Sequence, residues 1–101
     1  MKSYKQLKGN LLAVAEFIRS KGYVKTHELD EWKVHTNQPT TRQQRDARIL
    51  AERGYIRRLS DKEKLETFGQ IKEDVWHWVS DYSSFEAKPV FVEIKNQLAF
   101  L

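Results

Sequence analysis

Six of the seven arginines of this 101-residue chain lie between Thr40 and Ser60, and none of its eleven lysines does. A guanidinium is a planar fork with a permanent charge, and it can bind a phosphate or the edge of a guanine through two hydrogen bonds. Amide side chains in the same stretch can bind adenine edges. The stretch therefore predicts recognition of phosphates and base edges. Its arginines are Arg42, Arg45, Arg48, Arg53, Arg57 and Arg58.

The net charge of +4 is concentrated in one part of the chain. Residues 36–60 hold these six arginines against Asp46 and Glu52, so the rest of the chain is neutral overall. A localised basic patch is the electrostatic pattern expected of a nucleic-acid binder. A basic helix surface that is merely solvated is the alternative interpretation of the same charges.

Several other kinds of chemistry lack the residues they need. The chain has no cysteine, which excludes disulfides, thiolate metal sites and a cysteine nucleophile. Its three histidines are dispersed without convergent ligands, so neither a metal nor a small-molecule cofactor is expected. No apolar run reaches the roughly 20 residues of a membrane span. The N-terminus has no apolar signal core, so a cytoplasmic protein without membrane contact is expected.

The first third of the chain predicts two helices around a short extended segment. Ser3 and Gln6 have the spacing of a capping box, and an apolar stripe with helical spacing then runs from Leu7 to Ile18, where Lys21-Gly22 ends the helix. Residues 23–25 are expected to be extended. A second helix over residues 27–33 should be capped by Thr26 and should bury Leu29 and Trp32.

A third helix is expected over residues 41–53, ending at Gly54, and this helix must position most of the arginines. At 100° per residue, Ala47 and Leu50 lie on the inner side with Gln43 and Asp46 flanking them. The outward residues are Thr41, Gln44, Arg45, Arg48 and Glu52.

The rest of the chain predicts strands. Residues 55–59 and 74–80 are expected to pair, with Trp76 and Trp78 on one strand face that should be covered. The long connection between them is either a short helix capped by Ser60 and Glu63 or an extended hairpin around Gly69. Residues 89–94 form a third expected strand.

Two segments carry a resemblance to a known family. In KTHELDEW, a threonine cap precedes the buried Leu29. In RDARILAERGYIRRL, Leu50 and Ala47 lie four and seven positions before Gly54, and the apolar Ile56 follows it. With the order of the expected elements, these segments resemble the winged helix-turn-helix DNA-binding superfamily. The resemblance implies an α+β fold with three helices, a β-hairpin wing and a C-terminal strand.

The resemblance covers residues 4–80, with residues 81–101 as a C-terminal strand and tail of the same single domain. It implies sequence-specific binding of double-stranded DNA by the third helix and the wing, in a small transcriptional regulator without enzymatic activity. Two departures from the family pattern, a longer connection before the third helix and Gln43 at a usually apolar position, favour a late start or an unusual docking angle for that helix. The implied base or phosphate contacts are Thr41, Arg42, Gln44, Arg45 and Arg48, and the implied backbone contacts are Arg57, Arg58, Lys62 and Lys64.

Three further hypotheses remain open from the sequence. The same fold could dock another protein in a larger assembly. Asp81 followed by Glu93-x-Lys95 resembles the signature of a restriction-like, metal-dependent nuclease superfamily. A homodimer could form through Trp76, Trp78 or the strand 90–94, which would place two third helices one DNA turn apart.

Overall fold

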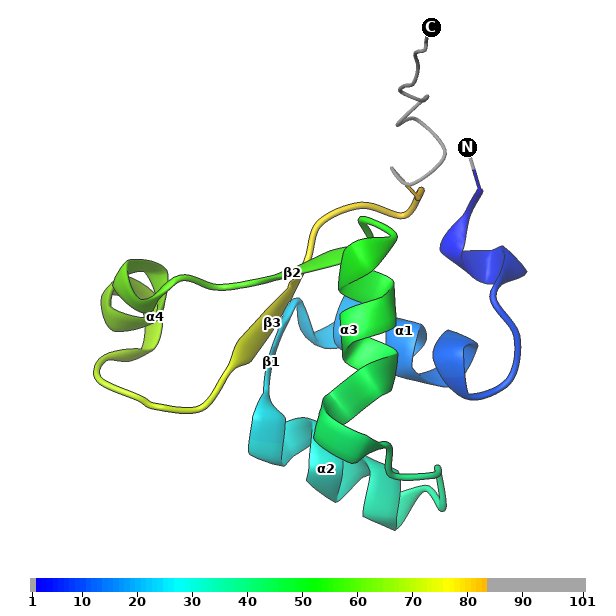
Figure 1. Ribbon diagram of the computed structural model, residues 1–101, viewed down its shortest axis with the longest axis horizontal. Coiled ribbons are helices and arrows are strands. Elements are labelled where there is room, and N and C mark those ends of the chain that lie inside the picture. Colours follow the sequence, from blue (N-terminus) through cyan, green and yellow to red (C-terminus); the bar gives the residue numbers. More distant parts are fainter. Residues whose placement is uncertain (1, 84–101) are drawn as a thin grey trace, which may run out of the picture.

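The computed structural model describes residues 2–83, which form a small α+β domain with four helices and a three-stranded antiparallel sheet (Figure 1). The strands lie in the order β1-β3-β2. The helices are α1 (Asn10–Lys21), α2 (Thr26–His35), α3 (Arg45–Glu52) and α4 (Asp61–Phe68), the strands are β1 (Tyr23–Lys25), β2 (Ile56–Arg58) and β3 (Val75–Trp78), and 3-10 turns cover Tyr4–Gln6 and Arg42–Gln44.

The predicted first helix is divided in the structure. Ser3 caps the short 3-10 turn Tyr4–Gln6, and α1 begins only at Asn10, after Gly9 with a φ of 60°. The predicted stripe still packs inward, because Val14 and Ile18 of α1 are fully buried. The helix ends as expected at Gly22, whose φ of 80° favours glycine.

Thr26 was predicted to be the N-cap of α2, and this prediction was wrong. Thr26 is the first residue of α2, and its hydroxyl donates to the carbonyl oxygen of Asp74 at 3.0 Å, so it ties α2 to the start of β3. Glu28 caps the helix instead, since its carboxylate accepts from the backbone N–H of Lys25 at 2.9 Å.

The third helix starts late, as the long connection before it favoured. The predicted span of residues 41–53 is broken by the 3-10 turn, in which Gln43 (φ 50°) and Gln44 (φ 51°) both adopt the left-handed conformation. α3 therefore begins at Arg45 and ends at Glu52. Ala47 and Leu50 are buried as predicted. The side chains before the break, however, point in other directions than they would in one continuous helix.

The connection between β2 and β3 contains a helix, which decides between the two alternatives for this segment. Ser60 accepts from the N–H of Glu63, and the Glu63 carboxylate accepts from the N–H of Ser60, so a capping box starts α4. Gly69, with a φ of 84°, ends it. α4 stands apart from the other three helices, at the far end of the β2–β3 hairpin (Figure 1).

The core lies between α1, α2, α3 and one face of the sheet. Trp76, at the centre of that face, is 3% exposed and pairs in register with Val24 of β1 and Arg58 of β2. Trp78 packs edge-on against Tyr4, and the two tryptophans therefore share a covered face, as predicted. The burial of Trp76 within one chain excludes it from the proposed dimer contact. Trp78 is only partly buried and stays a candidate for that contact, and strand 90–94 lies outside the described residues.

Within residues 2–83, no helix combines the length and apolar character needed to cross a membrane.

Candidate nucleic-acid interface

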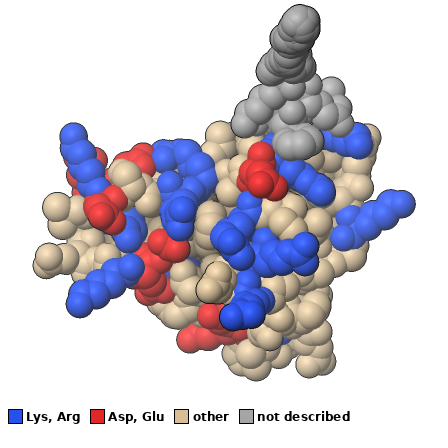
Figure 2. Space-filling model, viewed as in Figure 1, with Lys and Arg blue, Asp and Glu red and all other residues tan. Residues whose placement is uncertain are grey.

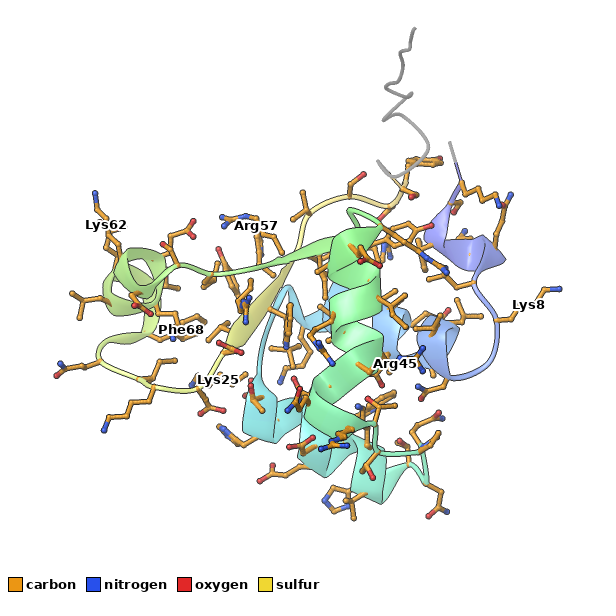
Figure 3. All side chains as sticks on the ribbon, viewed as in Figure 1. Lys8, Lys25, Arg45, Arg57, Lys62 and Phe68 are labelled. Carbon is orange, nitrogen blue, oxygen red and sulfur yellow. The ribbon has the colours of Figure 1, made fainter. Side chains whose placement is uncertain are left out.

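The exposed side of α3 carries the candidate site. α3 runs across the front of the domain in the view of Figure 1, and Lys and Arg side chains gather over this part of the surface in Figure 2, with acidic groups among them. Arg45 and Arg48 are exposed one turn apart, and Glu52 follows on the same side. Arg45 projects outward from the first turn of α3 (Figure 3).

The guanidinium groups around α3 have no carboxylate partner in the described part of the chain. The side chains of Arg42, Arg45 and Arg53 make no hydrogen bond or ion pair with another residue of that part. Arg48 donates only its Nε to the carbonyl oxygen of Gln43, at 3.2 Å, which leaves the two terminal nitrogens of its fork available. These four groups can therefore bind an anion without first losing an internal partner.

The two arginines of β2 are held by carboxylates of the same chain. Arg57 binds Glu63 through two hydrogen bonds of 2.9 and 2.6 Å, and Arg58 lies 3.4 Å from Asp74 and over the Trp76 ring. The hydrogen bonds from Arg57, followed by the one from the Ser60 N–H, lower the pKa of Glu63 to about 2. A phosphate would have to displace these carboxylates to reach either arginine.

Two predicted site residues, Lys64 and Gln44, are buried and make contacts inside the domain. Lys64 was expected to bind backbone phosphates but is only 6% exposed, and its Nζ donates to the carbonyl oxygen of Glu73 at 3.2 Å. Thr41 lies before the 3-10 turn, and its Oγ1 accepts from the N–H of Asp46 at 3.4 Å. Lys62 does project from α4 into solvent, as Figure 3 shows.

The second buried site residue is Gln44, which was expected to face DNA but is 8% exposed. Its Oε1 accepts from the indole N–H of Trp76 at 2.9 Å. Its Nε2 donates to the carbonyl oxygen of Thr26 at 3.1 Å and to Asp30 at 3.3 Å. The left-handed backbone turns this side chain inward, so Gln44 joins α2, α3 and β3 instead of reading a base.

We expect Gln44→Ala to lower the free energy of unfolding by about 1–3 kcal/mol, because it leaves the buried N–H of Trp76 without an acceptor. Denaturant unfolding followed by tryptophan fluorescence measures this loss. Gln43→Ala is the matched control, since Gln43 has the same backbone conformation and an exposed side chain. Equal losses from the two variants would show that the buried amide contributes nothing.

A buried ion pair fixes α3 against α1 and α2, and sequence reasoning missed it. Lys33 Nζ lies 2.8 Å from Asp46 Oδ2, and the two side chains are 0% and 2% exposed. Asn10 donates to the same oxygen at 3.1 Å, and the N–H of Ala47 donates to Oδ1 at 2.8 Å. One signal was present, because Lys33 follows the buried Leu29 by four residues and so shares its side of the helix.

The pKa of Asp46 reflects two opposing effects. Burial raises the pKa of this carboxyl, but the ion pair with Lys33 and the hydrogen bonds from Asn10 and from the N–H of Ala47 together outweigh it. The pKa therefore lies below its ordinary value, and folding favours the ionised form. The ionised Asp46 therefore helps to hold α3, the helix that carries Arg45 and Arg48, against α1 and α2.

The residues behind the nuclease hypothesis are only partly described. Asp81 accepts two hydrogen bonds from Arg19, at 2.8 and 3.0 Å, and one from the indole N–H of Trp78 at 2.9 Å, which together occupy its carboxylate. Residues 93 and 95 lie outside the described part of the chain. Among residues 2–83, no cluster of three or more histidine and carboxylate side chains could hold a metal ion.

Comparison of the chain with protein-family models, with curated proteins and with solved structures found no match. Its function is therefore inferred from its own residues and their geometry.

Proposed function

We propose that this protein is a winged helix-turn-helix domain that binds double-stranded DNA, with α3 as the helix that enters the major groove. The order α1-β1-α2-α3-β2-β3 and the sheet order β1-β3-β2 support this assignment. The hairpin β2–β3 would be the wing, with α4 inserted in it. The proposed role is that of a small, non-enzymatic transcriptional regulator, and a homodimer would bring two such helices to one DNA site.

The observation that carries the proposal is the exposed side of α3. Arg45 and Arg48 are neighbours on it, and neither has a carboxylate partner in the described part of the chain. The width of the major groove, about 12 Å, admits an α-helix. An arginine there can bind the O6 and N7 atoms of a guanine through two hydrogen bonds, which distinguishes guanine from the other bases.

A protein-binding role is the second candidate, and one observation favours it. Residues 60–74, between β2 and β3, carry five carboxylates and three lysines, and Leu65 on α4 is 59% exposed. An acidic insert with an exposed leucine suits a protein surface better than a DNA backbone. The two roles need different surfaces of the molecule, and the salt dependence of binding separates them.

We expect the affinity for duplex DNA to fall steeply with salt. If the four arginines around α3 that lack carboxylate partners contact phosphates of a random-sequence duplex, the slope of log K against log salt should be roughly −3 to −4, at about 0.9 per phosphate neutralised. Fluorescence anisotropy with a random-sequence duplex measures the slope. Glu52→Gln removes the acidic charge of the same helix surface and should strengthen binding. A flat salt response would favour the protein-binding role.

A further inference from the structure

A cationic pocket lies beyond the C-terminal end of α3, beside Arg53. Its volume is about 420 Å³, and it is bounded by the N-terminal segment, the start of α1 and the residues after α3. Lys2, Lys8 and Arg53 contribute to its lining, and no carboxylate of the described residues does. Of these cations, the side chains of Lys8 and Arg53 have no anionic partner among the described residues, so the pocket is suited to an anionic ligand.

Hydrogen bonds hold the walls of this pocket in place. The hydroxyl of Tyr55 donates to the carbonyl oxygen of Lys2 at 3.1 Å, and the N–H of Ser83 donates to the same oxygen at 2.8 Å. The Ser83 hydroxyl donates to the carbonyl oxygen of Arg53 at 2.8 Å. The N-terminal segment is thus fixed beside the end of α3, and the exposed residues Lys8 and Arg53 both line the pocket.

The geometry points to a backbone phosphate of the bound DNA as the ligand of this pocket, an inference that rests on the proposed function. α3 has eight residues and a length of about 12 Å, which is close to the width of the major groove. The end of a helix lying across the groove meets the phosphates that border it. Arg53 immediately follows α3, so it lies at that border, and Lys8 lines the same pocket.

The opposite end of the molecule offers a weaker phosphate contact. Lys8 and Lys62 project from opposite ends of the view in Figure 3. Residues 60–74 around Lys62 carry more carboxylates than lysines, and Arg57 and Arg58 are already paired. By contrast, residues 1–9 carry three lysines and no carboxylate. The second DNA contact, in addition to that of α3, is therefore assigned to the pocket and not to α4.

The test measures the salt dependence of duplex binding for the parent, Lys8→Gln, Arg53→Gln, the double variant and Lys62→Gln. Each pocket variant should flatten the slope by about 0.9 and weaken binding severalfold at moderate salt, equally for all sequences. Lys62→Gln should leave the slope unchanged. All three side chains are exposed and lack a hydrogen-bond partner among the described residues, so the variants should fold, which circular dichroism checks.

Three results would overturn the inference. An unchanged slope in the double pocket variant would remove the pocket from the DNA contact, as would a loss of slope in Lys62→Gln alone, and either would leave the proposed function intact. A parent that binds no duplex would overturn the proposed function and this inference together.

A second measurement separates DNA from a free phosphate as the source of the ligand. In ¹⁵N-labelled protein, the duplex should shift the amide signal of Lys8 and the side-chain Nε signal of Arg53, whereas inorganic phosphate at the same phosphorus concentration should shift them little. Saturation of these signals by inorganic phosphate below millimolar concentration, with no shift on addition of duplex, would show a site for a small phosphorylated ligand and overturn the inference.

Discussion

Replacing Asp46 with alanine is expected to lower the free energy of unfolding by about 3–5 kcal/mol, the range found when one partner of a buried ion pair is removed. The change leaves the fully buried Lys33 without its counter-charge, and it also removes the acceptor of the Asn10 amide and of the Ala47 N–H. A domain of this size has a stability of about 5–15 kcal/mol in total. Denaturant unfolding of Asp46→Ala measures the loss.

The matched comparison is the double variant Lys33→Met/Asp46→Leu, which removes both charges and fills a similar volume. We expect it to be much more stable than Asp46→Ala, because buried pairs replaced by apolar residues are often neutral or better. Glu66→Ala, which removes an exposed carboxylate of α4 without an ion-pair partner among the described residues, should have little effect. A loss below about 1 kcal/mol for Asp46→Ala would contradict the structural role of the pair.

Because of the Lys33–Asp46 pair, the free energy of unfolding of the parent should fall as the solution becomes acidic. The pKa of Asp46 is lower in the folded chain than in the unfolded chain, so its contribution is complete above the unfolded pKa of about 3.9 and is lost as the pH falls below it. Glu73 and Asp81 also have lowered pKa values and act in the same direction. The double variant should therefore lose less stability than the parent between pH 5 and 2.

The second large effect is expected at the DNA interface. Arg45→Ala and Arg48→Ala should each weaken binding to a preferred duplex by about 1–3 kcal/mol and relax the preference at particular base pairs. Neither side chain is needed for packing, since both are exposed and Arg48 makes only one hydrogen bond, to a backbone oxygen of the 3-10 turn. Competition binding with preferred and scrambled duplexes measures both quantities.

Arg48→Lys tests whether specificity depends on the planar shape of the guanidinium group or only on its positive charge. Lysine keeps the positive charge but loses the planar fork, so this variant should retain most non-specific affinity and lose much of the specificity. If Arg45→Ala and Arg48→Ala fold normally and still bind the preferred duplex like the parent, α3 does not read the sequence.

The sequence predicted the order of the elements well, because apolar periodicity depends on neighbouring residues alone. Ala47 and Leu50 were placed inward, and Arg45 and Arg48 outward, from spacing within one unbroken helix. Gln44 was misplaced because the left-handed conformations of Gln43 and Gln44 interrupt the helical phase. Glutamine is not a residue type that predicts such a conformation, so no local pattern marked the break.

The internal pairing of the hairpin arginines was not predictable for a different reason. Glu63 reaches Arg57 because the capping box with Ser60 fixes the start of α4 there, and the sequence left the alternative of an extended hairpin open. The pairing of Arg58 with Asp74 depends in the same way on how β2 and β3 are aligned. Charge counting along the chain treats all six arginines alike, whereas the fold leaves four of them without a carboxylate partner among the described residues.

Selection of bound sequences from a pool of random duplexes is the most direct test of DNA recognition by α3. We expect the parent to enrich a defined motif that contains guanine, because the forks of Arg45 and Arg48 are the groups that α3 offers to base edges. The folded double variant Arg45→Ala/Arg48→Ala should bind weakly and enrich no motif. Enrichment of the same motif by both proteins, or of none by the folded parent, would contradict sequence reading by α3.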